Sequence, residues 1–334
     1  MLPLSSHSGR KNRKRSRQNP FSESIIIETG RTGFRRKKMD IVEGYVPFRN
    51  GQTYYRIVGY HYKKTPVVFI HGGPGSTHNS FEVLDSFADY DRRPVVMYDQ
   101  YGCGLSSLGL ENDTKTYSKE TWVEELSNLR ERLGLTKMHM MGHSWGGMLS
   151  IIYLCDYHPE GILSCTLSST LASASLWDKE THRLIRYLDK EDRDAIAMAE
   201  KTGDYSTEAF QKANADYLKM TVRNLEEMKD VPECLLRERP KSPSYVTAWG
   251  VSEFRPSGNL KDYEYLDKLG EIQVPIMLLS GADDESTPLQ NKEMFDRIRT
   301  EKEWHILSPS RHSIYIEQNK AYQEYLKSFL DRHE

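Results

Sequence analysis

Short apolar runs that alternate with amphipathic segments limit the fold of this chain more than any other feature of its sequence. Pro66–His71 and Pro94–Asp99 are continuous apolar runs, a pattern typical of strands buried on both faces of a parallel sheet. Lys119–Leu133 has helical spacing and leads into a strand at Lys137–Met141. This alternation predicts an α/β fold with a mostly parallel central sheet.

A hairpin is expected before the first apolar run. Ile41–Pro47 and Thr53–Gly59 are predicted as short strands, and Asn50-Gly51 between them is a dipeptide typical of tight hairpin turns. The strand and helix pattern then continues, and the further expected elements are a helix at Ser144–Tyr157, a strand at Ile162–Ser168, a strand at Val274–Ser280, a helix at Pro288–Arg299, a strand at Trp304–Leu307 and a helix at Lys320–Asp331.

The segment between the strands at 162–168 and 274–280 has a different character. It contains no apolar run of strand length, and its charged helical stretches are Lys179–Lys190, Glu191–Lys201 and Ser206–Lys229. We therefore expect an α/β core formed by residues 39–170 and 259–334, interrupted by a helical cap at residues 171–258. Residues 1–38 are expected to form a basic, disordered leader.

Charge and composition exclude several classes of protein. Residues 1–38 contain eleven Lys and Arg against two Glu, a net charge of +9, so the remaining residues carry −11 of the total of −2. An acidic body is not expected to bind nucleic acid, and no apolar stretch is long enough for a membrane span or a secretory signal. The four cysteines form no CxxC pair, so no zinc site or disulfide framework is indicated. A cytoplasmic protein without a metal or cofactor is the expectation.

Gly142–Gly146 has the pattern G-x-S-x-G between a predicted strand and a predicted helix, which is the context of a nucleophile elbow. A serine hydroxyl is a weak nucleophile at neutral pH, so it needs an imidazole to accept its proton and a carboxylate to orient that imidazole. The chain order serine, acid, histidine is met by Ser144, an acidic group after the strand at 274–280, and His312. The acidic group consists of Asp283, Asp284 and Glu285. Their positions alone leave the choice of acid open.

The oxyanion that forms at an attacked carbonyl needs two backbone N–H donors that are in place beforehand. The residue directly after the nucleophile, Trp145, is expected to supply one of them. The glycine-rich turn His71–Gly75, which follows the first apolar run, is expected to supply the other.

Several segments stand in the order found in a known family: His71–Gly75, Asp99–Gly104, Gly142–Gly147, Asp284–Pro288 and Ser310–His312. In these segments, and over most of residues 41–334, the chain resembles the proline iminopeptidases, serine aminopeptidases of the α/β-hydrolase fold. The resemblance implies that fold. It further implies Ser144 as nucleophile, Asp284 as the orienting acid with Asp283 as the alternative, His312 as base, and Gly73 and Trp145 as oxyanion donors.

The same resemblance implies that Glu253 and Glu285 hold the free α-ammonium group of the substrate. The chemistry supports this role, because carboxylates in a partly desolvated pocket bind ammonium through charge-assisted hydrogen bonds. The implied activity is release of an N-terminal residue, preferably proline, from short peptides with a free N-terminus. The implied mechanism is a Ser-His-Asp acyl-enzyme without a cofactor.

Nucleic-acid association through the basic residues 1–38 could coexist with this activity, and two alternatives to the activity itself stay open. One is an amino-acid amidase or small-ester hydrolase with the same triad, although an esterase for neutral substrates has no use for two carboxylates at its pocket. The other is a non-catalytic binding protein on a hydrolase scaffold, against which the intact set of Ser144, Asp284 and His312 argues. The sequence does not indicate the oligomeric state.

Overall fold

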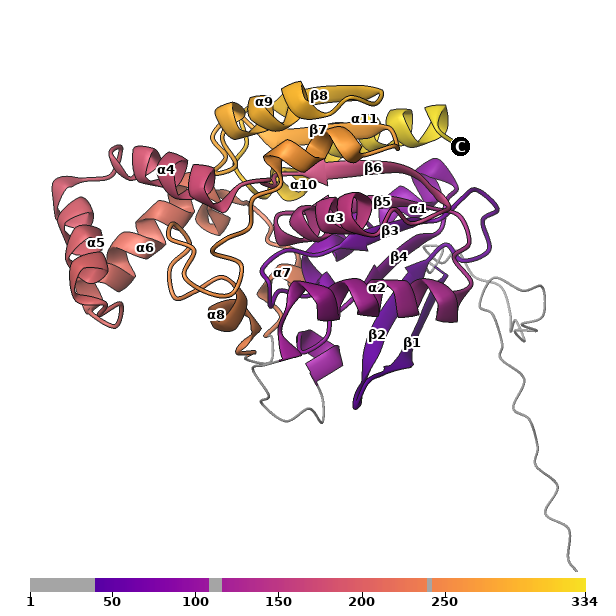
Figure 1. Cartoon of the computed structure of the whole chain (residues 1–334), viewed down its shortest axis with the longest axis horizontal. Coiled ribbons are helices and arrows are strands. Elements are labelled where there is room, and N and C mark those ends of the chain that lie inside the picture. The colour runs from indigo at the N-terminus through magenta and orange to yellow at the C-terminus, as the bar shows by residue number, and fades with distance from the viewer. Residues whose placement is uncertain (1–39, 108–115, 239–241) are drawn as a thin grey trace, which may run out of the picture.

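The computed structural model describes residues 40–107, 116–238 and 242–334, so the predicted leader at 1–38 lies outside the described residues. Within these ranges the chain forms an eight-stranded sheet in the order β1-β2-β4-β3-β5-β6-β7-β8, with helices on both faces (Figure 1). The strands are β1 (Ile41–Phe48), β2 (Gly51–Val58), β3 (Val67–Ile70), β4 (Val95–Tyr98), β5 (Met138–His143), β6 (Ile162–Ser168), β7 (Ile276–Gly281) and β8 (Lys302–Leu307).

The sheet is antiparallel only at one edge. β1 pairs antiparallel with β2, and β2 pairs antiparallel with β4. All pairs from β4 through β3, β5, β6 and β7 to β8 are parallel. The predicted α/β fold with a mostly parallel sheet is therefore confirmed. Because parallel strands end at the same edge, the loops that follow them gather there, which is where such sheets carry their sites.

The central strands send alternate side chains to opposite faces. In β3, Val68 and Ile70 pack into the core on one face, whereas Val67 and Phe69 pack into the core on the other. The first face is covered by α2 (Lys119–Leu133), α3 (Trp145–Asp156), η5 (Leu266–Glu271) and α9 (Pro288–Arg297). The second is covered by η1 (His78–Leu84), α1 (Ser86–Asp91), α10 (Ile314–Glu317) and α11 (Asn319–Arg332). Burial on both faces explains the uninterrupted apolar runs of the sequence.

The prediction of a hairpin turn at Asn50-Gly51 is wrong by one residue. Phe48 pairs with Gly51, so the loop consists of Arg49 and Asn50, and Arg49 takes a φ of 48°. The Arg49 guanidinium donates hydrogen bonds to Thr121 Oγ1 at 2.9 Å and to Glu124 Oε2 at 2.6 Å, both on α2. These contacts help to offset the cost of a left-handed φ in a residue with a Cβ. The dipeptide preference for Asn-Gly does not include contacts with a distant helix, so it could not predict this turn.

The described segment between β6 and β7 contains α4 (Ala174–Ile185), α5 (Lys190–Thr202), α6 (Glu208–Thr221), α7 (Glu233–Leu236) and α8 (Ser244–Ala248), and α4, α5 and α6 stand to the left of the sheet in Figure 1. The predicted helix at Lys179–Lys190 has the wrong bounds, because Ser173 Oγ accepts a hydrogen bond from Leu176 N at 3.0 Å and starts α4 earlier. The predicted helix at Ser206–Lys229 is also wrong at its end, since α6 stops at Thr221. The cap boundaries at 171 and 258 stay a prediction.

The turn from β5 into α3 brings the helix against the end of β3. A Cβ on Gly146 would lie 1.9 Å from the carbonyl oxygen of Ile70, and a Cβ on Gly142 would lie 2.3 Å from the carbonyl oxygen of Gly146. Between these glycines Ser144 adopts φ 55° and ψ −123°, which is a costly conformation for a residue with a Cβ. The glycines of the G-x-S-x-G pattern are therefore required by direct backbone contact.

Gly146→Ala should lower the free energy of unfolding by more than about 3 kcal/mol, because its methyl group meets backbone that has no room to move aside. Gly203→Ala is the control, since Gly203 has a left-handed φ of 74° but no neighbouring atom within 4 Å of an added Cβ. It should cost only about 1 kcal/mol. Urea unfolding followed by circular dichroism measures both values. Equal losses would show that contact with Ile70 is not what requires glycine.

Candidate active site

Ser144 stands at the carboxyl edge of the sheet, where β5 ends and α3 begins. Its amide donates a hydrogen bond to the carbonyl of Ser168 at 3.0 Å, and its carbonyl accepts one from Thr170 Oγ1 at 2.7 Å. Both partners come from the end of β6 or just beyond it. The neighbouring strand therefore holds the elbow in place, and Ser144 lines a pocket of about 260 Å³.

Two loops bring an acid and a histidine to this pocket. Asp284 follows β7 and His312 follows β8, and His312 Nδ1 lies 2.7 Å from Asp284 Oδ1 in a buried hydrogen bond. The same Oδ1 accepts a hydrogen bond from the amide of Ser286 at 2.7 Å. Asp283 is exposed to solvent. The geometry thus brings Asp284, and not Asp283, to His312.

The segment that carries His312 is joined to the cap. The amide of His312 donates a hydrogen bond to the carbonyl of Thr221 at 3.0 Å, and the amide of Ser313 donates one to the carbonyl of Val222 at 3.0 Å. Thr221 is the last residue of α6. The end of α6 therefore helps to hold the histidine at the sheet edge.

The charges around His312 favour its protonated form. Burial lowers the pKa of His312, but the charge and hydrogen bond of Asp284, followed by the charges of Glu285 and Glu253, raise the pKa to about 9. His143 packs its ring with the centroid 4.8 Å from that of His312. Burial, and then repulsion from His312, hold the pKa of His143 well below its usual 6.5. Because His143 is neutral, it does not repel a positive charge on the neighbouring His312.

Glu253 and Glu285 face the pocket that Ser144 lines. Glu285 is 1% exposed, and its Oε2 has no hydrogen-bond partner among the described residues. Burial, and then the charge of Glu253, raise the pKa of Glu285 well above its usual value, and burial also raises the pKa of Glu253. Two acids that share a desolvated pocket are stabilised by a bound cation. The arrangement therefore has the chemistry of an ammonium site.

Three aromatic side chains from the segment between β6 and β7 fix the position of Glu253. The carbonyl of Glu253 accepts hydrogen bonds from Trp177 Nε1 at 2.9 Å and from Trp249 Nε1 at 3.1 Å. Its carboxylate accepts a further hydrogen bond from the hydroxyl of Tyr245. The sequence offers these three residues only as aromatic side chains of the insert and assigns none of them a role. Helical spacing gives no signal that separates such a role from ordinary aromatic packing.

The two expected oxyanion donors lie close to Ser144. Trp145 is the first residue of α3, and the first amides of a helix have no acceptor within the helix itself. Gly73 lines the same pocket as Ser144 and has a φ of 112°. A Cβ on the adjacent Gly72 would lie 2.9 Å from the Cβ of Ser144. The glycine-rich loop therefore passes directly against the elbow.

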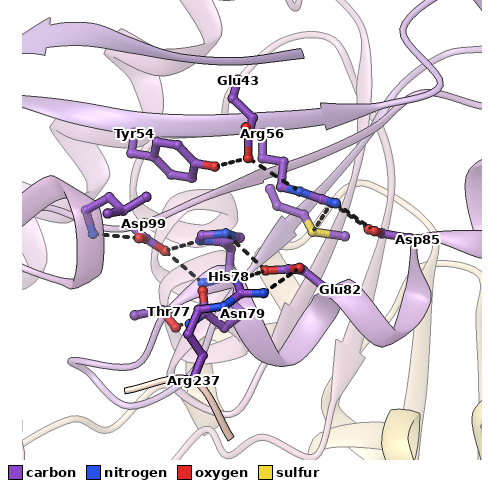
Figure 2. Close-up of polar contacts among 12 residues, drawn as sticks. Glu43, Tyr54, Arg56, Thr77, His78, Asn79, Glu82, Asp85, Asp99 and Arg237 are labelled. Carbon is purple, nitrogen blue, oxygen red and sulfur yellow. Dashed lines mark hydrogen bonds and ion pairs between the residues drawn. The ribbon is translucent and has the colours of Figure 1, made fainter. Parts of the chain in front are cut away.

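The loop that begins at Asp99 is bound to η1. Asp99 Oδ1 accepts hydrogen bonds from the amide of His78 at 2.8 Å and from its Nδ1 at 2.7 Å, and Asp99 Oδ2 accepts one from the amide of Leu105 at 2.8 Å (Figure 2). These bonds fix the loop to the segment that directly follows the glycine-rich turn at 71–75. Asp99 is thus a structural residue of the sheet edge.

A second pocket, of about 460 Å³, is lined in part by Asp99 and is larger than the pocket of Ser144. Polar side chains around it already have partners: Arg56 pairs with Asp85, Arg237 pairs with Glu82, and His78 is hydrogen-bonded to Asp99 (Figure 2). Since these charges already have partners, size alone does not make this pocket a site. The reactive groups gather in the smaller pocket.

Within residues 40–107, 116–238 and 242–334, no three His, Cys, Asp or Glu side chains are grouped so that they could hold a metal ion. The same ranges contain no helix with both the length and the apolar composition needed to cross a bilayer.

Comparisons with known proteins identify the family. Residues 65–318 match the family model of the alpha/beta hydrolase fold. The proline iminopeptidase of Lactobacillus helveticus (strain DPC 4571) is 50% identical over 297 residues, which cover 89% of this chain and 100% of that protein. The crystal structure of VinJ has a TM-score of 0.79 and 30% identity, covering 88% of this chain and 99% of that one.

The crystal structure of the proline iminopeptidase from Mycobacterium smegmatis has a TM-score of 0.75 and 25% identity, covering 87% of this chain and 98% of that one. Sequence identity over the full length of the relative and the shared fold agree. The chain therefore belongs to the proline iminopeptidases, serine aminopeptidases of the α/β-hydrolase fold.

Proposed function

We propose that this enzyme releases the N-terminal residue, preferably proline, from short peptides with a free N-terminus. Ser144 attacks the carbonyl of that residue, and His312, oriented by Asp284, takes the proton of the hydroxyl. The amides of Gly73 and Trp145 stabilise the oxyanion. His312 then gives the proton to the leaving amine, and water attacks the acyl-enzyme with His312 as base to release the amino acid.

The observation that carries this proposal is the pair of glutamates that line the pocket of Ser144, the buried Glu285 and the half-buried Glu253. A substrate with a free N-terminus places a positive charge one atom away from the scissile carbonyl. Such a charge supplies the cation that the unpartnered Oε2 of Glu285 lacks. A neutral ester would bring no cation to these two carboxylates. The pair therefore favours an aminopeptidase over a small-ester hydrolase.

An amino-acid amidase would use the same ammonium contact and would differ only in its leaving group. The relative from Lactobacillus helveticus, which is named for a peptidase activity, supports a peptide as the substrate. The cytoplasm is the compartment that we propose. All four cysteines are buried free thiols, and such thiols are typical of a reducing compartment.

Hydrolysis of the 4-nitroanilides of proline, alanine and leucine, each with a free and with an acetylated amino group, tests the proposal. We expect the free proline substrate to be cleaved fastest. Acetylation should lower kcat/KM at least about 100-fold, because it removes the cation that the glutamates bind. Ser144→Ala should lower the rate by roughly 10⁴-fold or more. Equal turnover of acetylated substrates would refute the ammonium site, and inactivity of the folded wild type on all six would refute the proposed function.

Asp284→Asn should lower kcat by about 10⁴-fold, because an asparagine no longer holds the imidazole of His312 in the tautomer that can accept the serine proton. Asp283→Asn is the matched control, since Asp283 is exposed and makes no contact with His312 in the structure. It should leave kcat within about twofold of the wild type. Steady-state kinetics on proline 4-nitroanilide measure kcat for both variants and show which of the two acids orients His312. A large loss in Asp283→Asn alone would reverse the assignment of the acid.

Glu285→Gln should change both substrate binding and the titration of His312. The charge of Glu285 is one of the factors that raise the pKa of His312, so its removal lowers that pKa. Because the base must be deprotonated, the acidic limb of kcat/KM for an uncharged ester should move to lower pH. The KM for free proline 4-nitroanilide should rise at least about tenfold. An acidic limb that does not move would show that Glu285 carries no charge next to His312.

A further inference from the structure

Gln100 lies where the loop after β4 meets the two segments that carry the proposed oxyanion donors. Its side chain is fully buried. Gln100 Oε1 accepts a hydrogen bond from Trp145 Nε1 at 2.7 Å, and Gln100 Nε2 donates one to the carbonyl of His71 at 2.8 Å. An indole nitrogen only donates and a carbonyl only accepts, so these partners fix the orientation of the amide. One side chain therefore joins the nucleophile elbow to the glycine-rich loop.

The backbone of Gln100 acts on the same loop through His71. The amide of Gln100 donates a hydrogen bond to His71 Nε2 at 3.0 Å, and His71 Nδ1 lies 2.8 Å from the carbonyl oxygen of Gly72. Because Nε2 accepts, the proton of the neutral ring is on Nδ1, which donates to Gly72. In a trans peptide the carbonyl and the N–H point to opposite sides. The bond to the carbonyl of Gly72 therefore sets the direction of the N–H of Gly73.

Gln100 is itself held through both of its neighbours. Asp99 is bound to η1 on one side (Figure 2). On the other side, the amide of Tyr101 donates to Glu125 Oε2 at 2.7 Å, and its carbonyl accepts from Trp122 Nε1 at 3.1 Å. Glu125 and Trp122 belong to α2, which packs on the sheet. Anchored neighbours keep the backbone of Gln100 in one place.

We propose that Gln100 is a positioning residue that sets the amides of Gly73 and Trp145 at the separation that the tetrahedral intermediate requires. This inference rests on the proposed serine mechanism. Gln100 does not touch the reacting atoms and acts through His71 and Trp145. Donors that are placed in advance stabilise the oxyanion more than the ground-state carbonyl. Loss of the two side-chain hydrogen bonds of Gln100 should therefore lower kcat and leave KM nearly unchanged.

Gln100→Met tests the inference, because methionine keeps the length of the side chain and loses both amide hydrogen bonds. With proline 4-nitroanilide we expect kcat to fall about 10- to 100-fold and KM to stay within about twofold. Pyrrolidine-2-boronic acid forms a tetrahedral adduct on a serine hydroxyl, and its affinity should fall by the same factor as kcat. Inhibition by free proline, a ground-state ligand, should not change.

Gln323→Met is the matched control. Gln323 on α11 is also buried, and its amide nitrogen donates hydrogen bonds to Ser86 and Asn319, outside the pocket of Ser144. This variant should lower Tm but leave kcat and the affinity for the boronic acid unchanged.

Trp145→Phe removes the indole N–H that donates to Gln100 Oε1. If Gln100→Met does not fold, kcat, KM and the affinity for the boronic acid are measured on Trp145→Phe instead. The two substitutions should not add, so the double variant should lose no more kcat than the more damaged single variant. A folded Gln100→Met enzyme with wild-type kcat, or with losses equal to those of Gln323→Met, would overturn the inference. A wild-type enzyme that is inactive on the proline substrate would overturn the proposed function instead.

Discussion

The close approach of α3 to the end of β3 is the contact on which the site depends. Gly146 lies so near the carbonyl of Ile70 that an added Cβ would be 1.9 Å from its oxygen. This contact sets the direction in which α3 leaves the elbow, and with it the place of the Trp145 amide. The glycine-rich loop continues from Ile70, so it reaches the same point. One backbone contact thereby brings together the parts that the proposed mechanism uses at the scissile carbonyl.

Sequence reasoning succeeded where burial on both faces controls the structure. β3, β4 and β7 were predictable because almost no polar side chain enters them, and the bounds of α2 and β6 were predicted without error. It failed where one distant or local contact decides the backbone. Arg49 adopts its turn conformation beside α2, and Ser173 starts α4 through a single capping bond. Neither effect is visible in a pattern of apolar residues.

The same distinction holds for the site. Chain order is sufficient to propose Ser144 and His312, but position in the sequence does not separate Asp283 from Asp284. Burial and the bond to His312 separate them in the structure. Other residues support the site through contacts that sequence position does not reveal. Tyr245 donates a hydrogen bond to the carboxylate of Glu253. Gln100 belongs to the family-like segment Asp99–Gly104, but that segment does not reveal its hydrogen bond with Trp145. The contact of Tyr245 exists only after the segment between β6 and β7 has folded, and the contacts of Gln100 exist only after the sheet edge has formed.

The hydrogen bonds from His312 and Ser313 to the end of α6 have a consequence for engineering. An insert that shapes substrate choice would be easy to exchange between enzymes if it touched the sheet only through its two chain connections. Here the carbonyls of Thr221 and Val222 also accept hydrogen bonds from the backbone amides of the histidine segment. A chimaera that replaces this insert must reproduce the end of α6, or it loses the two backbone hydrogen bonds that hold the segment of the proposed base, His312. The insert is therefore joined to the histidine segment through backbone hydrogen bonds as well as through its two chain connections.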